Sequence, residues 1–187
     1  MGNASALTGK LLIAMPFMQD TRFEQSVIYV CGNDRQGSIG LVLNKIMAQV
    51  TSESLLRQMG VSAQAHHAHF PIHYGGPVEP NRGFVLHDSS YETAATVSVG
   101  NGFCITTTGD VLRAIACGQG PVQYVTCLGY TGWAYGQLER EVHDNGWLVV
   151  DGRAELVFPK TPTTQWHQCM EALRVNPWAL SPYSGRA

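Results

Sequence analysis

Short runs of apolar and β-branched residues, separated by turn-forming residues, recur along most of the chain. The runs at 11–15, 25–31 and 38–44 predict three opening strands, and the turn formers at 32–37 predict that the second and third pair as a hairpin. Further runs of the same kind predict strands at 72–74, 83–87, 97–99, 103–106, 122–128, 147–150 and 155–158. The pattern therefore favours a sheet of many short strands.

Helical periodicity is confined to four segments, at 51–60, 107–118, 136–145 and from 161 onward. A capping box, in which Thr107 caps and the Asp110 carboxylate reaches back, is expected to start the second helix. Strands outnumber helices and do not alternate with them, which favours an α+β fold over a doubly wound parallel sheet.

No internal repeat, linker or low-complexity stretch divides the 187 residues, and one hydrophobic core can serve a chain of this length. We expect a single domain over 1–187, with 1–8 and 178–187 loosely ordered. The first apolar run contains Pro16 and does not have the form of a signal peptide, and no run approaches transmembrane length. A cytoplasmic protein without a membrane partner is the expectation.

Charged residues make up only 14% of the chain, against about 25% in an average soluble domain. The net charge of -2 and the pI of about 6.4 give no global positive field that would attract nucleic acid or anionic lipid. No pair of helices has the spacing of a helix-turn-helix, so direct DNA binding is disfavoured. A surface of low charge, with aromatic residues such as Trp178, favours a protein partner or a homo-oligomer.

The five cysteines are odd in number and widely spread, which is typical of reduced thiols in a cytosolic protein. Cys31 could act as a nucleophile with His87 or His143 as its base, although a core thiol is the simpler interpretation. No nucleophile elbow, zincin pair, kinase loop or calcium loop occurs in the chain. An enzyme of unknown reaction stays open as an alternative.

Four histidines within eight residues form the candidate metal cluster, namely His66, His67, His69 and His73. Imidazoles ligate zinc, nickel or copper, but metal ligands usually stand on fixed elements with supporting partners, and this segment has no periodicity. A polar surface loop is therefore the preferred interpretation, and we expect neither a metal nor another cofactor.

Two glycine-containing segments have the form of anion sites. Gly75 and Gly76 before Pro77 can present backbone N–H groups, and Arg82 follows closely as a possible anion partner. Residues 129–137 are expected to leave a buried strand and enter a helix, an arrangement that favours phosphate, although their glycine spacing fits no known nucleotide motif.

Four segments together resemble the AlgH/YqgE family of bacterial proteins, in an order and spacing that cover nearly the whole chain. They are Leu12-Ile13-Ala14-Met15-Pro16 with 23–29, the run 37–45, Tyr74-Gly75-Gly76-Pro77-Val78 with 81–87, and 128–139 with Trp147-Leu148. The resemblance implies a bent, bifurcated, mostly antiparallel sheet that forms a pseudo-barrel with a few peripheral helices. It implies no established activity, and the AlgH name carries only a proposed role as a transcriptional regulator in alginate production.

Two classes of function follow from these observations. In the first, family-like polar, aromatic and glycine residues at predicted strand ends and turns converge on a cleft for a small anionic or nucleotide-like ligand. These candidate residues are Asn44, Gly75, Gly76, Arg82, His87, Thr107, Tyr130, Trp133 and Gln137. In the second, the protein is a non-catalytic regulatory or interaction module. A transcriptional regulator of the AlgH type, acting on transcription directly or indirectly, is the alternative form of this class. The same residues could also serve only the turns and the core.

Overall fold

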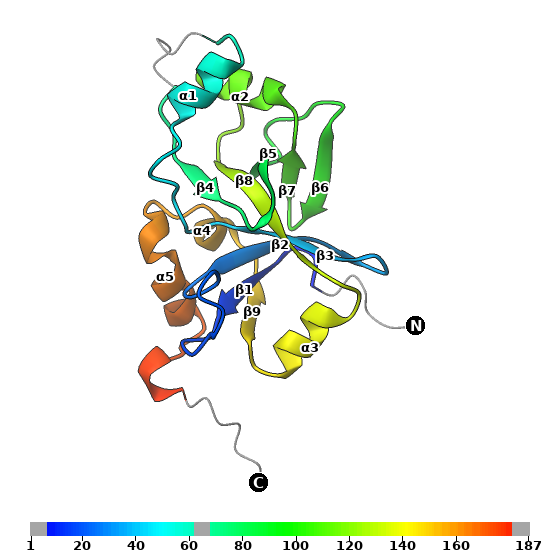
Figure 1. Ribbon diagram of the computed structural model, residues 1–187, viewed down its shortest axis with the longest axis vertical. Helices are drawn as coiled ribbons and strands as arrows, with labels where there is room; N and C mark the ends of the chain where they lie inside the picture. Colours follow the sequence, from blue (N-terminus) through cyan, green and yellow to red (C-terminus); the bar gives the residue numbers. More distant parts are fainter. Residues whose placement is uncertain (1–6, 62–67, 181–187) are drawn as a thin grey trace.

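The computed structural model describes residues 7–61 and 68–180, which fold into a curled sheet with helices at its periphery (Figure 1). Nine strands are found in these residues: β1 Lys10–Ala14, β2 Val27–Asp34, β3 Gly37–Val42, β4 Ile72–Tyr74, β5 Val78–Asp88, β6 Thr96–Gly100, β7 Phe103–Thr106, β8 Tyr124–Trp133 and β9 Trp147–Asp151. Their order across the sheet is β6-β7-β5-β8-β3-β2-β1-β9, and β4 pairs separately with β8. The β4–β8 pair is parallel and the other pairs are antiparallel.

Strand β8 joins the two halves of the sheet and bends between them. Residues 124–128 pair with β5, whereas residues 131–133 pair with β3. Gly129 lies at the bend with a φ of 73°, and a Cβ there would come within 2.3 Å of the Gly76 carbonyl oxygen. The prediction that 129–137 leaves the strand at once is therefore wrong, because β8 continues to Trp133. The bent, mostly antiparallel sheet confirms the predicted fold class.

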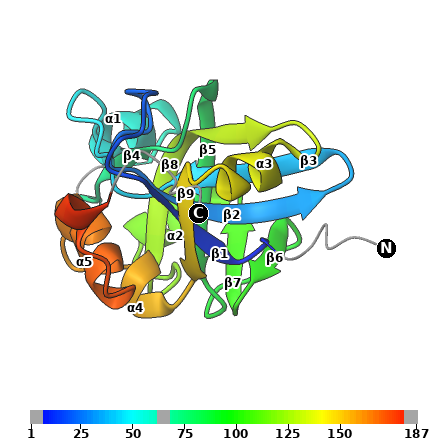
Figure 2. The same cartoon turned by 90° about the horizontal axis from the view of Figure 1, so that it is seen from below.

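Five α-helices flank this sheet in the described residues: α1 Ser52–Gln58, α2 Gly109–Ala116, α3 Gln137–His143, α4 Ala154–Val157 and α5 Gln165–Ala172. In Figures 1 and 2, α1 and α2 lie at one end, α3 lies near β9, and α4 and α5 follow one side. The strand predicted at 155–158 is wrong, since α4 occupies most of it. Leu156 and Val157 are buried there, and a short apolar run alone does not distinguish helix from strand.

The two helices near the end of the molecule start differently. Thr51 caps α1 as expected, with its Oγ1 accepting from the Ser54 N–H at 3.2 Å. The predicted capping box of α2 is wrong, because Thr108 rather than Thr107 is the N-cap and its side chain makes no capping hydrogen bond. Asp110 instead pairs with Arg113 at 2.9 Å.

The buried apolar residues form three clusters. The largest lies within the curl of the sheet and a second packs against α3. The third lies beneath α1 and α2 and includes Leu56, Ile72, Val85, Val111 and Ile115. None of the helices in the described ranges has the length and apolar character that crossing a membrane requires. The third cluster matters for function, because it supports the walls of the cavity described next.

Candidate ligand-binding site

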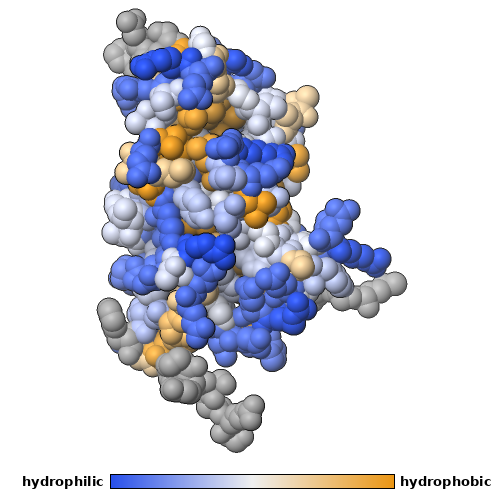
Figure 3. Space-filling view, viewed as in Figure 1, coloured by the Kyte–Doolittle hydropathy of each residue, from blue (hydrophilic) through white to orange (hydrophobic). Residues whose placement is uncertain are grey.

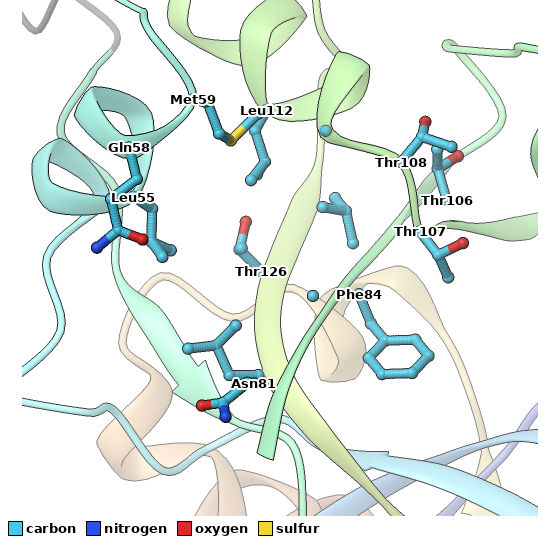
Figure 4. A pocket seen from close by; sticks show the side chains of 14 residues that line it. Leu55, Gln58, Met59, Asn81, Phe84, Thr106, Thr107, Thr108, Leu112 and Thr126 are labelled. Carbon is cyan, nitrogen blue, oxygen red and sulfur yellow. The ribbon is translucent and has the colours of Figure 1, made fainter. Parts of the chain in front are cut away.

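A cavity of about 200 Å³ lies between α1 and α2 and is floored by β5 and β8 (Figure 4). We call it the α1–α2 cavity. Its apolar and glycine lining consists of Leu55, Met59, Gly83, Phe84, Val85, Gly109, Leu112 and Leu128. Its polar lining consists of Gln58, Asn81, Thr106, Thr107, Thr108 and Thr126. In the space-filling view, hydrophobic side chains reach the surface in this end of the molecule and are framed by hydrophilic ones (Figure 3).

The α1–α2 cavity is polar only through amide and hydroxyl groups. Every side chain that lines it is uncharged at neutral pH, and six of the fourteen lining residues are amides or threonines. Such a lining resembles the usual composition of small-molecule sites, in which an apolar wall carries a few polar groups that fix orientation. The cavity is thus suited to hold a molecule rather than to transfer protons.

Thr126 is the unusual residue of this lining. It lies on β8 between β4 and β5, and its exposed fraction is 2%. Its Oγ1 is buried and has no hydrogen-bond partner among the described residues. Figure 4 shows the hydroxyl turned toward the interior of the cavity, on the side of Leu112. An unpaired buried hydroxyl costs about 1–3 kcal/mol, so this group is arranged at the expense of stability.

Thr106 lines the same cavity, but its hydroxyl is fully engaged. Its Oγ1 lies 2.9 Å from His87 Nε2 and 2.8 Å from Thr96 Oγ1. His87 Nδ1 lies 2.7 Å from the carbonyl oxygen of Asp88, which can only accept. This network assigns the proton to Nδ1, and Thr106 therefore donates to Nε2. Burial lowers the pKa of His87, which favours the same neutral form.

A second cavity, of about 420 Å³, lies beside α3 and is called the α3 cavity. Glu141 stands in its lining and accepts three side-chain hydrogen bonds. The indole N–H groups of Trp133 and Trp147 both donate to Oε2 at 2.9 Å, and the Gln137 amide donates to Oε1 at 2.9 Å. The two indoles also meet edge to face, with centroids 6.3 Å apart. This carboxylate fastens α3 to β8 and β9.

The structure divides the nine predicted site residues among several places instead of bringing them into one cleft. Trp133 and Gln137 line the α3 cavity, and Thr107 lines the α1–α2 cavity. Tyr130 packs its ring edge to face on Phe84 and borders a third cavity near β3. The nine residues therefore do not converge on one cleft, contrary to the prediction.

The remaining predicted residues have structural contacts. Asn44 accepts from the Val27 N–H at 2.9 Å and donates to the Gln25 carbonyl at 2.8 Å. A Cβ on Gly75 or Gly76 would come within 2.2 Å of the backbone of β8, so both positions require glycine. The Arg82 side chain, half exposed, pairs with Glu79 at 2.8 Å and stacks on Phe84. His87 is fully buried and belongs to the threonine network.

The candidate thiol and histidines of the sequence do not form a catalytic or metal group where they are described. Burial raises the pKa of Cys31 to about 12, which removes the thiolate needed for nucleophilic attack. His69 lies 3.2 Å from Glu53, whereas His73 is buried on β4. His66 and His67 lie outside the described residues, and no group of three possible metal ligands occurs within those that are described.

Sequence reasoning missed Thr126, Gln58 and Asn81 as site residues. The available signal was a hydroxyl within 122–128, an apolar run that predicts a strand buried on both faces. A polar side chain inside such a strand needs a partner. Nothing in the sequence shows that this partner is missing, because the neighbours of Thr126 come from distant segments.

The fold and the two cavities define a small α+β protein whose curled, half-barrel sheet carries short helices over one end. A family model described as AlgH-like matches residues 11–178. A UPF0301 protein of Paracoccus denitrificans is 41% identical over 190 residues and spans 100% of both chains. One from Ruegeria pomeroyi is 43% identical over 183 residues, covering 97% of this chain and 99% of the relative. The chain belongs to the AlgH-like family.

Solved structures agree with this assignment. The solution structure of the AlgH protein from Pseudomonas aeruginosa has a TM-score of 0.76 with 36% identity, and each chain is covered over 100% of its length. A crystal structure of a Corynebacterium diphtheriae protein has a TM-score of 0.73 at 18% identity, with 92% of this chain and 90% of that chain covered. The second likeness concerns the fold alone.

Proposed function

We propose that this protein is a non-catalytic regulatory module that binds a small molecule in the α1–α2 cavity. The observation that carries the proposal is the buried hydroxyl of Thr126, which has no hydrogen-bond partner among the described residues and is turned into a cavity of about 200 Å³. A polar group kept unpaired at a cost to stability is characteristic of sites selected for binding. The regulatory role is part of the same proposal and follows the expectation that the resemblance to the AlgH/YqgE family gave.

The chemistry of the lining supports binding over catalysis. General acid–base and nucleophilic catalysis need a titratable group or an activated nucleophile at the reacting atoms. The lining supplies amides, hydroxyls and apolar groups, and the Thr106 hydroxyl is held by His87 and Thr96.

All five cysteines are free thiols, which supports a cytoplasmic location for the protein.

The cavity is lined by two different helices, so ligand binding can change how α1 and α2 are placed relative to each other. Arg113 of α2 donates to the carbonyl of Met59, which ends α1, at 3.3 Å. The Met59 side chain also lies against the start of α2 at Gly109. A molecule that fills the cavity contacts both helices and thereby favours one relative placement of them. We infer that a partner protein recognises the relative placement of α1 and α2 that the ligand favours.

The test uses a variant that fills the cavity. Gly83 lines the floor on β5, lies on the same face as Val85, and a Cβ built on it meets nothing within 4 Å. Gly83→Val should therefore obstruct the cavity without a backbone clash. Gly132→Ala is the matched control, because this β8 glycine also has room for a Cβ and lines the α3 cavity.

Both variants and the original protein are titrated with indole, hexanoate, inorganic phosphate and AMP, and backbone amide shifts are followed by NMR. At least one probe should give saturable shifts at Gly83, Gly109 and Leu112 with a Kd of about 1 mM or lower. Gly83→Val should abolish them and Gly132→Ala should preserve them. If no probe shifts these amides, or if Gly83→Val binds unchanged, the proposal is overturned.

A further inference from the structure

We propose that the ligand of the α1–α2 cavity is an uncharged molecule of about one ring, whose hydrogen-bonding substituent meets the Thr126 hydroxyl. This inference rests on the proposed function and specifies the ligand that such a module takes. It differs from the anionic or nucleotide-like ligand that the sequence suggested. Size, charge and orientation each contribute one step.

The size of the ligand follows from the cavity volume of about 200 Å³. Apolar protein cavities of about 150 Å³ accept a benzene molecule. A six-membered ring with one short substituent therefore fits the space, whereas a nucleotide with base, ribose and phosphate would extend beyond it. Leu55 of α1 and Leu112 of α2 both line the cavity, so a bound ring can contact both side chains.

The lining of the cavity indicates that the ligand carries no charge. A carboxylate or phosphate transferred into an apolar site is strongly disfavoured unless a cation or several donors meet it. Among the described residues no cationic side chain lines the cavity, and Arg113 is engaged with Asp110 outside the lining. The start of α2 does not substitute for a cation, because Asp110 stands in its first turn and Met59 covers Gly109.

The orientation follows from Thr126. Its hydroxyl can both donate and accept, and it lies on the floor where Val85 and Leu128 provide apolar surroundings. A ligand hydroxyl or carbonyl that reaches this point gains a hydrogen bond that the free protein does not have. A ligand without such a group leaves Thr126 unpaired. Thr126 is therefore inferred to select the substituent, while the apolar walls select the ring.

Three probes of closely similar size separate these contributions: toluene, benzyl alcohol and benzoate. They share one ring and differ in having no polar group, a hydroxyl and a negative charge. Dissociation constants are measured from the amide shifts of Gly83, Gly109 and Leu112 for the original protein, Thr126→Val and Thr131→Val. Thr131 is the matched control, since it lies on the same strand, is equally buried and lines the α3 cavity.

Benzyl alcohol should bind most tightly, with toluene about 5- to 10-fold weaker, which is the worth of one hydrogen bond. Benzoate should bind more weakly than toluene. Thr126→Val should weaken benzyl alcohol to the toluene level or below, because the ligand hydroxyl is then buried without a partner, and should leave toluene unchanged. Thr131→Val should alter neither. Urea midpoints of the variants confirm that each is folded during the titration.

The contradicting outcomes are distinct. Tighter binding of benzoate overturns the uncharged class and supports an anionic ligand, while the proposed function survives. Equal affinities of benzyl alcohol for the original protein and for Thr126→Val overturn the role of the hydroxyl. Binding of indole, hexanoate, phosphate or AMP without binding of any single-ring probe overturns the size class. Failure of every probe at these amides removes the proposed function itself.

Discussion

The α1–α2 cavity and the α3 cavity both lie against β8, yet they use polar side chains in opposite ways. Beside α3, the Glu141 carboxylate accepts from both tryptophans and from Gln137. Beneath α1 and α2, the Thr126 hydroxyl has no partner in the described structure. Both cavities contain residues of segments that carry the family resemblance. Membership of such a segment therefore does not separate structural residues from ligand-binding ones.

Hydrogen-bond satisfaction separates them instead. A buried polar group with all its partners stabilises one arrangement of the chain, and removing it leaves those partners unsatisfied. A buried polar group without partners lowers the stability of the free protein and, where it borders a cavity, is available to a ligand. We accordingly assign the α3 cavity to stability and the α1–α2 cavity to binding. Four measurements test this contrast.

The largest effect is expected from Glu141→Ala. The change leaves the indole N–H groups of Trp133 and Trp147 and the Gln137 amide without their acceptor. Hydrogen bonds to a charged group contribute about 1.5–3 kcal/mol each, so the free energy of unfolding should fall by about 3 kcal/mol. Urea denaturation measures it. Glu155→Ala, at an exposed carboxylate on α4, should change it by less than about 0.5 kcal/mol.

A loss below about 1 kcal/mol for Glu141→Ala would show that the three donors find other acceptors. The α3 cavity would then resemble the α1–α2 cavity in containing polar groups that the fold does not require. The assignment of the α3 cavity to stability would be withdrawn.

The next effect concerns Thr106→Val, at the engaged threonine of the α1–α2 cavity. Valine conserves the shape but leaves His87 Nε2 and Thr96 Oγ1 without their shared partner. We expect the free energy of unfolding to fall by about 2 kcal/mol. Thr107→Val, at the exposed neighbour, is the control and should have little effect. Equal stability of the two variants would contradict the hydrogen-bond network derived for His87.

The third expected effect is a difference between the two regions in how their contribution to stability depends on pH. Burial lowers the pKa of His73 and of His87, so the unfolded chain takes up protons first as the pH falls through about 6.5. Stability from keeping these rings neutral is therefore complete above that pH and declines below it. The pKa of Asp20 beside the α3 cavity is lowered by its hydrogen bonds from Arg22, so its contribution is lost only below about pH 4.

Urea midpoints measured from pH 8 to pH 5 should consequently decrease, and hydrogen exchange should rise first at β5 and β7. His143→Gln alters an exposed histidine and should preserve the decrease. A midpoint that stays constant over this range would show that neither buried histidine resists protonation.

The smallest effect is expected from Thr126→Val in the absence of ligand. The substitution removes an unpaired hydroxyl and retains its shape, so the free energy of unfolding should stay constant or rise by up to about 1 kcal/mol. The same method applies, with Thr106→Val as the contrasting variant. A clear loss of stability in Thr126→Val would mean that its hydroxyl serves the fold, and the contrast between the cavities would disappear.

Local patterns predicted most elements because hydrophobic alternation and turn residues act over short distances. The strand expected at 11–15 corresponds to β1, and the opening hairpin is confirmed as β2 and β3. The segment 155–158 failed because burial of Leu156 and Val157 is compatible with either helix or strand. The segment 129–137 failed because its glycines permit a bend within a strand as well as an exit from it.

The candidate site was less predictable than the fold. Glycine and aromatic residues at turns suggested one cleft, yet Gly75 and Gly76 are explained by close contact with β8 and Asn44 by its hydrogen bonds to the backbone. Thr107 lines the α1–α2 cavity, and it does not cap α2. Sequence patterns report which residue types occur, and they do not report which polar atoms remain unpaired.

The α+β class, most of the strands and the family could be predicted from the sequence, because periodicity, turn chemistry and ordered motifs are properties of neighbouring residues. Only the folded chain shows that Glu141 accepts three hydrogen bonds and that the Thr126 hydroxyl has no partner among the described residues. The partners of Thr126 would have to come from α1, α2, β4 or β5, which are distant in sequence and meet only in the folded chain. Whether a buried polar group finds a hydrogen-bond partner therefore depends on how these distant segments pack together. The proposed binding site rests on this property.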